Sequence, residues 1–344
     1  ATDPDREGEA IAWHIKEYLN EKKLIKDKQL ERVVFNEITK KAVVHGIENP
    51  RQIETLLVDA YMARRALDYL VGFNISPILW TKLPGSKSAG RVQSVALKLI
   101  TEREHEIELF NPEEFWTLSV KFSDNDKNSL LASITQLNNK KIEKFSFKNK
   151  IEIDKAMDEL KYKKFQISDI SSKIINRNPS GPFTTSTLQQ VSSGRLGFGA
   201  SRTMQIAQKL YQGIEINGET IGLITYMRTD GTNLSTDAIE TFREYIKNNL
   251  GREYVPDSPA SYTGKKAKNA QEAHEAIRPT DIIRTPETIK KYLSPDQHKL
   301  YDLIWCRALS SQIKPAQFDR NTITITSDDN GTVCKASGSV IKFD

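Results

Sequence analysis

The sequence predicts a multidomain fold that combines α/β, mainly α and β parts, with a helical domain inserted into a β domain. At 344 residues the chain is too long for one compact core, so we expect roughly two to four domains. The hydrophobic patterns then change in the order α/β, α, β, α, β. A chain that leaves a β segment, builds a helical unit and returns to β structure indicates one domain inserted into another.

The composition limits the class of protein. The chain carries 50 Lys and Arg against 45 Asp and Glu, a formal net charge of +5, which permits a nucleic-acid partner provided that the basic residues cluster. Its two cysteines, Cys306 and Cys334, are too few for a zinc cluster and predict reduced thiols rather than a disulfide framework. The sequence shows no signal peptide and no long apolar run, so we expect a soluble intracellular protein.

Residues 1–110 are predicted to be mainly helical. The apolar positions of residues 8–19 repeat at helical spacing, and residues 50–110 continue with two helical patterns around a basic turn. Between them RVVFNEIT, residues 32–39, begins with a β-branched run and is predicted to form a strand that ends at a functional edge.

The rest of the chain alternates between strands and helices. FWTLSVKF, SLLASITQ and KFQISDI alternate like strands, with a solvated Lys- and Asn-rich loop among them. Ser201 is then a candidate N-cap for SRTMQIAQKLY, Ser235 or Thr236 caps TDAIETFREYI, and AQEAHEAI and QHKLYDLIWCRAL follow as helices. NTITITS and TVCKASG return to strands. The domain boundaries that we expect are 1–49, 50–108, 109–182, 183–312 and 313–344.

DPDREGE is a candidate metal site. Asp3, Asp5 and Glu7 stand at alternate positions ahead of a helix, and hard cations such as Mg²⁺ take carboxylate oxygens while they keep several waters. Arg6 lies between them and is a candidate phosphate ligand. The alternative is an acidic helix N-terminus that the helix dipole favours, because D-x-D is a common pattern.

LPGSKSAGRVQS is a candidate phosphate-contacting turn. Gly85 and Gly90 have the gap of a phosphate loop, but Arg91 and Val92 stand where a Walker A loop requires Lys and then Ser or Thr. Backbone N–H groups and an arginine at the start of a helix still suit phosphate. The alternative is a basic turn between two helices.

ARRALDYLVGF is a candidate nucleic-acid-binding helix. It carries Arg64, Arg65 and Asp68 together with Tyr69 and Phe73, and arginines beside aromatic rings suit single-stranded nucleic acid. The alternative is an ordinary helix whose leucines are core and whose arginines are solvated.

AQEAHEAIRP offers a histidine and an arginine. His274 and Arg278 stand four residues apart, so on a helix they share a face and would clamp a phosphate. The alternative is a surface histidine without a ligand, which is the more frequent case.

TYMRTDGTNLS, residues 225–235, is the candidate catalytic stretch. On a strand Tyr226, Arg228 and Asp230 share one face. Tyrosine has a reference pKa of about 10 and is a weak nucleophile at neutral pH, but a neighbouring cation favours the phenolate. Arg228 would also stabilise charge on a phosphate in the transition state, with Asp230 to orient it. The alternative is an exposed ladder of these side chains at a strand end.

In their order along the chain, the motifs resemble a known family. DPDREGEAIAWH, VVFNEIT, ARRALDYLVGF, SAGRVQSVAL, FTTSTLQQ, RLGFGASRTM, GLITYMRTDGTNLS and EAHEAIRPTD together resemble type IA DNA topoisomerases, and the bacterial topoisomerase I branch most of all. The resemblance runs from Ala1 to about Ala308. It implies an incomplete type IA topoisomerase toroid, with a toprim remnant, a helical lobe and a β arch whose inserted helical domain carries the active tyrosine.

The resemblance implies a role for each matching residue. Tyr226 would be the nucleophile that cuts one DNA strand and holds its 5′-phosphate, and Arg228 would assist it. Asp3, Asp5 and Glu7 would bind Mg²⁺. The implied DNA-binding residues are Arg64, Arg65, Asp68, Phe73, Trp80, Ser88, Ala89, Gly90, Arg91, Val92, Gln93, Arg195, Asp230, His274 and Arg278.

The implied reaction needs no ATP. A phosphodiester is exchanged for a phosphotyrosine diester of comparable energy, another strand passes, and the free 3′ end reseals the break. The implied partner is DNA, in single-stranded regions of negatively supercoiled molecules, for a monomeric protein of the bacterial cytoplasm without a membrane partner. The competing interpretations are another toprim enzyme, such as a primase or nuclease, which has no use for YMRTD, and a non-catalytic DNA-binding protein.

The chain departs from the family pattern in three places. It opens with ATDPDREGE, in the middle of a motif and without an initiator methionine, so we expect a segment of a longer protein without the first toprim strand and its glutamate. We also expect the C-terminal zinc or basic modules to be missing, and Gly231 stands where the family often has serine. We therefore expect these 344 residues alone to bind single-stranded DNA weakly and to cleave it poorly, which robust relaxation would refute.

Overall fold

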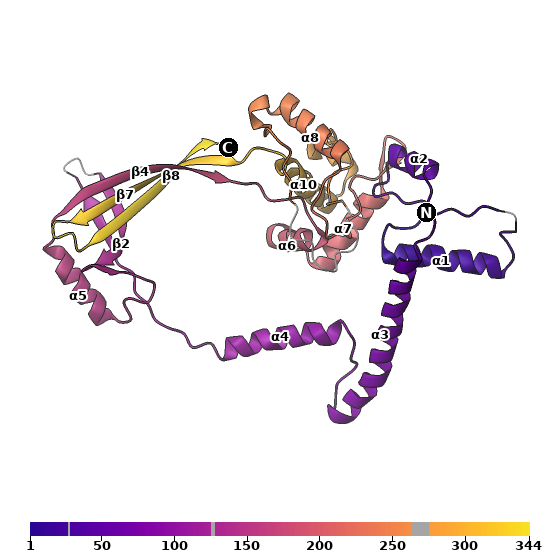
Figure 1. Cartoon of the computed structure of the whole chain (residues 1–344), viewed down its shortest axis with the longest axis horizontal. Helices are drawn as coiled ribbons and strands as arrows, with labels where there is room; N and C mark the ends of the chain where they lie inside the picture. The colour runs from indigo at the N-terminus through magenta and orange to yellow at the C-terminus, as the bar shows by residue number, and fades with distance from the viewer. Residues whose placement is uncertain (27, 125–127, 263–274) are drawn as a thin grey trace. The chain divides into compact units, whose positions relative to one another are not determined.

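The computed structural model describes residues 1–26, 28–124, 128–262 and 275–344, and it divides into two compact units. The first unit joins Ala1–Thr101 to Pro179–Lys314, and the second joins Glu102–Asn178 to Pro315–Asp344. Each unit is therefore built from two stretches of chain that are distant in sequence (Figure 1). The content is mixed α and β, as the sequence predicts.

The second unit is an antiparallel sheet with one helix packed on it. The strand order is β1–β2–β8–β7–β4, with β3 paired to β2, and β4 pairs with β7 from Phe165 to Arg177. Helix α5 (Lys150–Lys161) contributes Ile153 and Ala156 to a core that the sheet completes. The predicted strands are confirmed as β1 (Ser119–Ser123), β2 (Ser129–Leu137), β4 (Phe165–Arg177), β7 (Ala316–Ser327) and β8 (Val333–Phe343), with β3 (Lys140–Lys141) in the polar loop.

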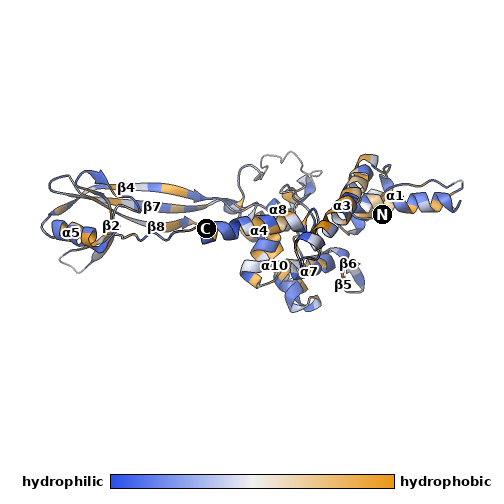
Figure 2. Cartoon of the chain, turned by 90° about the horizontal axis from the view of Figure 1, so that it is seen from below, coloured by the Kyte–Doolittle hydropathy of each residue, from blue (hydrophilic) through white to orange (hydrophobic). Residues whose placement is uncertain are grey.

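The N-terminal part of the first unit is helical. It contains α1 (Arg6–Glu21), α2 (Lys40–Glu48), α3 (Thr55–Lys82) and the start of α4 (Gln93–Glu108), and α1 packs on α3. Asp5 caps α1, because its Oδ1 accepts a hydrogen bond from Gly8 N at 2.7 Å. Many large apolar side chains of α3 and α4 are exposed, and Figure 2 shows hydrophobic residues along α3.

The C-terminal part of the first unit surrounds the stretch that holds Tyr226. Helices α6 (Thr185–Leu196), α7 (Ala200–Gln212) and α10 (Pro295–Ser310) pack around it, and Leu223, Ile224 and Met227 are fully buried among them. The remaining elements are β5 (Ile214–Ile216), β6 (Glu219–Ile221), α8 (Thr236–Asn249), η1 (Arg252–Tyr254), α9 (Pro286–Ile289) and η2 (Lys290–Tyr292). In the part of the chain that the structure describes, every helix is too short or too polar to span a bilayer.

The predicted strand at residues 32–39 is wrong. Only Arg32 forms a bridge, with Arg51, and the backbone then makes single hydrogen bonds to another part of the unit. Asn36 O accepts from Tyr226 N at 2.8 Å, and Ile38 O accepts from Gly222 N at 3.1 Å. Because these hydrogen bonds are isolated, residues 33–39 form no strand ladder.

The stretch around Tyr226 is not a strand end either. Ile224 alone forms a bridge, with Pro279, and residues 226–230 have no strand assignment. Tyr226 N donates to Asn36 O, and Thr229 N donates to Thr185 Oγ1. The two backbone N–H groups therefore bond to two different segments of the chain. The argument from alternating strand faces therefore does not apply here.

Two of the predicted helix features also differ. Helix α7 begins at Ala200 with Gly199 as its N-cap, so Ser201 lies inside the first turn rather than capping it. The predicted helix AQEAHEAI falls mostly outside the described residues, and its described end is extended, because Ile277 forms a bridge with Phe183. The other cap prediction is confirmed, since Ser235 caps α8.

Candidate active site

The hydroxyl of Tyr226 is bound to the acidic loop. Tyr226 Oη donates a hydrogen bond to Asp5 Oδ2 at 2.6 Å, across 221 positions of sequence. The ring is 2% exposed and packs edge-on against Tyr211, with the ring centroids 5.3 Å apart. The tyrosine is thus held by the core through its ring and by one carboxylate through its hydroxyl.

Arg228 reaches the same loop from the same segment. Its Nη1 lies 3.4 Å from Glu7 Oε2 and 4.0 Å from Asp5 Oδ2, and its side chain remains 54% exposed. The predicted convergence of Tyr226 and Arg228 on one place is therefore found, although not through a strand. The partners of the arginine are Glu7 and Asp5 rather than Asp230.

The phenol of Tyr226 is strongly disfavoured as a phenolate in this arrangement. Burial, the hydrogen bond to Asp5 and the charges of Asp5 and Asp3 raise the pKa of Tyr226 well above its usual value. Arg228 lowers that pKa, as the sequence predicts, but its contribution is outweighed. The phenol is consequently protonated at neutral pH, and any attack by its oxygen requires an acceptor for the proton.

A buried ion pair holds the acidic loop in place. Arg32, 2% exposed in its side chain, donates from Nη1 to Thr2 O at 3.1 Å and from Nη2 to Asp3 O at 3.0 Å. Its Nε donates to Glu9 Oε2 at 3.1 Å, and Glu9 also accepts from Arg51 and from Glu54 N. Sequence reasoning missed this network, because neither Glu9 nor Arg32 belongs to a recognisable spacing.

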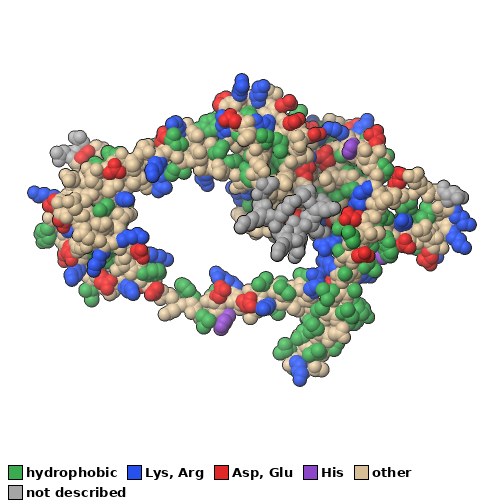
Figure 3. Space-filling view, in the orientation of Figure 1, with side chains coloured by type: hydrophobic (Ala, Val, Ile, Leu, Met, Phe, Trp, Pro, Cys, Tyr) green, Lys and Arg blue, Asp and Glu red, His purple; other side chains and the backbone are tan. Residues whose placement is uncertain are grey.

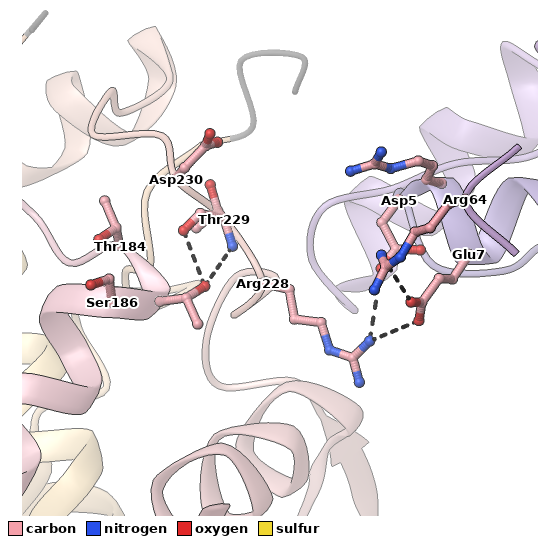
Figure 4. A pocket seen from close by; sticks show the side chains of 10 residues that line it. Asp5, Glu7, Arg64, Thr184, Ser186, Arg228, Thr229 and Asp230 are labelled. Carbon is pink, nitrogen blue, oxygen red and sulfur yellow. Dashed lines mark hydrogen bonds and ion pairs between the residues drawn. The ribbon is translucent and has the colours of Figure 1, made fainter. Parts of the chain in front are cut away.

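A cavity of about 400 Å³ opens beside these groups (Figure 4). Arg6, Arg64 and Arg228 supply positive charge, and α6 presents its N-terminal turn, which attracts anions through the helix dipole. These features suit the phosphates of a nucleic-acid strand. The lining residues are Asp5, Arg6, Glu7, Arg64, Thr184, Thr185, Ser186, Arg228, Thr229 and Asp230.

The first turn of α6 was not among the predicted site residues. Thr184 caps the helix in a capping box with Thr187, and Thr185 Oγ1 donates to Met227 O at 2.7 Å. Thr185 therefore ties the helix N-terminus to the segment that carries Tyr226. The spacing of two threonines in FTTSTLQQ is the sequence signal that points to this cap.

The acidic loop carries carboxylates of the kind that Mg²⁺ takes as ligands. Asp3 and Asp5 are near enough that burial and the charge of Asp5 raise the pKa of Asp3, and a divalent cation would relieve that repulsion. Glu7 faces the arginines, at 3.4 Å from Arg228 and 3.9 Å from Arg64. Among the described residues no three acidic, His or Cys side chains form a ready metal cluster. Mg²⁺ commonly takes one or two carboxylates and completes its shell with waters and phosphate oxygens.

The predicted nucleic-acid helix places its charged residues beside the acidic loop. Arg64, Arg65 and Asp68 lie on α3 and line a smaller cavity of about 290 Å³ together with Glu7 and Tyr61. Phosphate contacts of Arg64 and Arg65 would therefore be close to the Tyr226 site.

The turn before α4 is organised by its own side chains. Arg91 Nε donates to Asp68 Oδ1 at 2.8 Å, which holds the pKa of Asp68 below its usual value. Gln93 Nε2 donates to Ser88 Oγ at 3.0 Å, and Gly90 N donates to Ser94 Oγ at 3.2 Å. Ala89 is buried and Val92 is 63% exposed.

Aromatic side chains on α3 are open to solvent. Phe73 is 68% exposed and stacks on Tyr69, with 4.4 Å between ring centroids. Trp80 is 58% exposed, and its Nε1 donates to Lys87 O at 2.6 Å. Exposed ring faces of this kind are available for stacking with bases.

The remaining predicted DNA-binding residues differ from one another in exposure. Arg195 on α6 and Asp230 are exposed, and Asp230 lines the cavity beside Arg228. Arg278 is only 7% exposed, and it forms ion pairs with Glu275 and Glu37 at 2.6 and 3.1 Å. His274 lies outside the described residues.

Two family models match the chain. The model described as DNA topoisomerase matches residues 52–344, and the model described as Toprim domain matches residues 1–38. Because the first match covers well over half of the sequence, the chain belongs to the DNA topoisomerase family. The family resemblance that the motifs indicate is therefore confirmed.

Individual proteins named as DNA topoisomerases are similar to this chain. The protein named DNA topoisomerase 1 from Rickettsia felis is 53% identical over 345 residues, which cover 100% of this chain and 44% of the relative. DNA topoisomerase 1 from Zymomonas mobilis is 49% identical, over 100% of this chain and 27% of the relative. The solved structure of full-length topoisomerase I from Thermotoga maritima is similar with a TM-score of 0.81 and 39% identity, over 99% of this chain and 53% of that one. The chain thus spans less than half the length of these curated relatives.

Proposed function

We propose that the chain is the catalytic part of a type IA DNA topoisomerase. It would cut one DNA strand through a 5′-phosphotyrosine, let another strand pass and reseal the break, and so relax negatively supercoiled DNA without ATP. The observation that carries the proposal is the hydroxyl of Tyr226 bound to Asp5 at 2.6 Å, at the edge of a cavity lined by three arginines. Membership of the DNA topoisomerase family supports it.

The cleavage step follows from the chemistry of these groups. Tyr226 Oη attacks the phosphorus, so an O–P bond forms, the P–O3′ bond breaks, and the 3′ oxygen leaves as a hydroxyl after it takes up a proton from solvent water. The phenolic proton has Asp5 Oδ2 as its nearest acceptor. Arg228 contacts the non-bridging oxygens, and its guanidinium offers them charge-assisted hydrogen bonds in the transition state.

Asp3 and Asp5 are the proposed holders of Mg²⁺, with Glu7 as a further carboxylate of the same loop. When bound, Mg²⁺ supplies positive charge that neutralises the phosphates of the DNA strand. The carboxylates of Asp5 and Glu7 line the same cavity as Arg6, Arg64 and Arg228, so an ion held there would add to the positive charge that the arginines supply.

The DNA strand would run from this cavity along α3 and its turn. The proposed contacts on α3 and in the turn that follows it are Arg64, Arg65, Asp68, Phe73, Trp80, Ser88, Ala89, Gly90, Arg91, Val92 and Gln93. The further proposed contacts, from later in the sequence, are Arg195, Asp230, His274 and Arg278. The proposed domains are 1–49 from the toprim domain, 50–108 as the helical lobe, 109–182 with 313–344 as the β arch, and 183–312 as the inserted domain. A monomer suffices for this arrangement.

The direct test is the polarity of a covalent adduct. The intact protein is incubated with single-stranded DNA and Mg²⁺ in the absence of ATP, and the reaction is stopped with detergent. We expect a 3′-end label to stay with the protein and a 5′-end label to be released, because the tyrosine holds the 5′-phosphate. Bound DNA without any adduct would favour a non-catalytic DNA-binding protein, and free cleaved strands would favour a toprim nuclease.

Replacing Arg228 should slow cleavage without preventing folding. We expect Arg228→Ala to lower the rate of adduct formation by about 10²- to 10³-fold, the usual effect of losing one group that stabilises a developing oxyanion. Arg228→Lys should recover part of the rate, because lysine keeps the charge but not the planar pair of donors. Single-turnover cleavage of an end-labelled strand measures this rate.

The matched control for Arg228 is Arg202→Ala, which removes an exposed arginine of α7 that is paired with Asp296. An equal loss in both variants would show that the effect belongs to net charge rather than to the site.

A further inference from the structure

A second cavity in the first unit has positive walls and no part in the Tyr226 site. It has a volume of about 670 Å³ and lies between the end of α8, η1 with the loop after it, and Lys314. It shares no lining residue with the cavity beside Tyr226. The lining residues are Arg243, Lys247, Arg252, Glu253, Val255, Pro256, Asp257 and Lys314.

Four of these side chains are cations, and two are acids. None of the four cations is in an ion pair with a residue that the structure describes, so their charge is available to a ligand. Arg243 and Lys247 stand four positions apart on α8, on one face, where like charges repel each other. Figure 3 shows basic side chains over α8 at the top of the view.

Arg243 gives the cavity a preformed anion-binding group. Its Nη2 donates to Pro256 O at 2.8 Å, which fixes the guanidinium against the loop. Its Nη1 is buried and has no hydrogen-bond partner among the described residues. A buried charged donor without a partner is unfavourable, so an incoming anion gains an interaction that the described part of the chain does not satisfy by itself.

The frame around the cations is rigid. Phe242 and Ile246 of α8 are 2% and 0% exposed, which fixes the face that carries Arg243. Lys314 N donates to Tyr254 O at 2.9 Å, and this bond ties the basic residue to η1. The cavity walls are therefore set by core packing and backbone pairing rather than by the charged groups themselves.

We propose that this cavity binds the phosphodiester backbone of DNA, at a place separate from the strand that Tyr226 cuts. The choice of DNA as the polyanion rests on the proposed function. Several unpaired cations around one opening match successive phosphates, whereas a single small anion needs only one or two of them. Lys247 and Arg252 are exposed, so they are open to phosphate contacts that do not depend on the base sequence.

The test compares two pairs of charge-removing substitutions in the intact protein. Binding of a labelled DNA duplex is measured by fluorescence anisotropy over a series of salt concentrations. For Lys247→Gln with Arg252→Gln, we expect the slope of log K against log salt to become shallower by about 1.8, because two phosphate contacts are lost. Lys290→Gln with Lys299→Gln removes the same charge from exposed positions outside the cavity, and we expect less than half of that change.

Two results would overturn the proposal. One is an equal change of slope in both pairs, which would show a general effect of net charge. The other is unchanged DNA binding together with a calorimetric heat for inorganic phosphate that only the cavity pair abolishes, which would assign the cavity to a small anion. The adduct assay separates this question from the proposed function, because it depends on Tyr226 and not on these residues.

Discussion

Tyr226→Phe is expected to abolish the covalent adduct with DNA and to lower relaxation by about 10⁴-fold or more, because the only atom lost is the attacking oxygen. The phenylalanine ring keeps the packing against Tyr211 and the core. The lost hydrogen bond to Asp5 costs about 1 kcal/mol of stability, so the variant should fold and still bind single-stranded DNA. Detergent-trapped adducts, relaxation assays and DNA anisotropy measure the three quantities.

Tyr211→Phe is the matched control for this experiment. Tyr211 is a buried neighbour whose pKa is raised to about 12, chiefly by burial. The hydroxyl that donates a hydrogen bond to Asp5 is that of Tyr226, not that of Tyr211. We expect this variant to form adducts at a rate within a few-fold of the parent. An adduct that persists in Tyr226→Phe, or one that disappears equally in Tyr211→Phe, would contradict the assignment of the nucleophile.

Arg32→Ala is expected to destabilise the first unit by about 3–5 kcal/mol, because it leaves the buried carboxylate of Glu9 without its innermost partner. The same change removes the donors to Thr2 O and Asp3 O, so the acidic loop should loosen even where the rest of the unit remains folded. Urea-induced unfolding measures the loss of stability. Adduct formation is measured separately, without urea, at a temperature at which the variant is folded. Arg32→Lys should not restore stability, since one ammonium group does not replace the forked donors.

The control for the stability effect is Lys41→Ala, which removes an exposed ion pair with Asp237 and should cost at most about 1 kcal/mol. The double variant Arg32→Ala with Glu9→Gln should be less destabilised than the sum of the single variants, because the buried charge is then absent. Full additivity would show that the two residues do not act as a pair.

The pKa of Glu9 predicts how the free energy of unfolding depends on acid pH. Burial alone would raise the pKa of Glu9, but hydrogen bonds from Arg51, Glu54 N and Arg32 together hold it below its usual value. A lowered pKa contributes stability above the unfolded value of about 4.3, and that contribution is lost as the pH falls through the folded value. The free energy of unfolding should therefore fall below about pH 4.5 more steeply in the parent than in Glu9→Gln, as urea titrations between pH 7 and pH 3 would measure.

Local signals in the sequence located most helices and strands. Ser235 or Thr236 was predicted to cap α8 because a short hydroxyl side chain precedes an amphipathic run, and the structure has Ser235 as the cap. The strands of the second unit were predicted from alternation, since their two faces differ in burial. These features depend on neighbours within a few positions, so the order of residues is sufficient to predict them.

Predictions failed where the backbone takes its partners from distant segments. RVVFNEIT has the composition of a strand, yet Asn36 and Ile38 bond singly to residues 222–226, a pairing that no local pattern encodes. Ile277 pairs with Phe183 although its surroundings have helical composition. Gly199 rather than Ser201 is the N-cap of α7, because the helix begins two residues earlier than the apolar spacing indicates.

The order of the motifs along the chain is sufficient to predict the family, and the motifs point to Tyr226, Arg228 and the acidic loop as the candidate centre. Only the tertiary structure placed the Tyr226 hydroxyl on Asp5, turned Glu7 toward Arg228, and joined Arg32 to Glu9 beneath the loop. The sequence predicts that Arg228 favours the phenolate of Tyr226. In the structure, burial and two carboxylates raise the pKa of Tyr226 more than this one arginine lowers it. The physical reason is that electrostatic energies depend on distance and burial in space, and residues 221 positions apart acquire both only when the chain has folded.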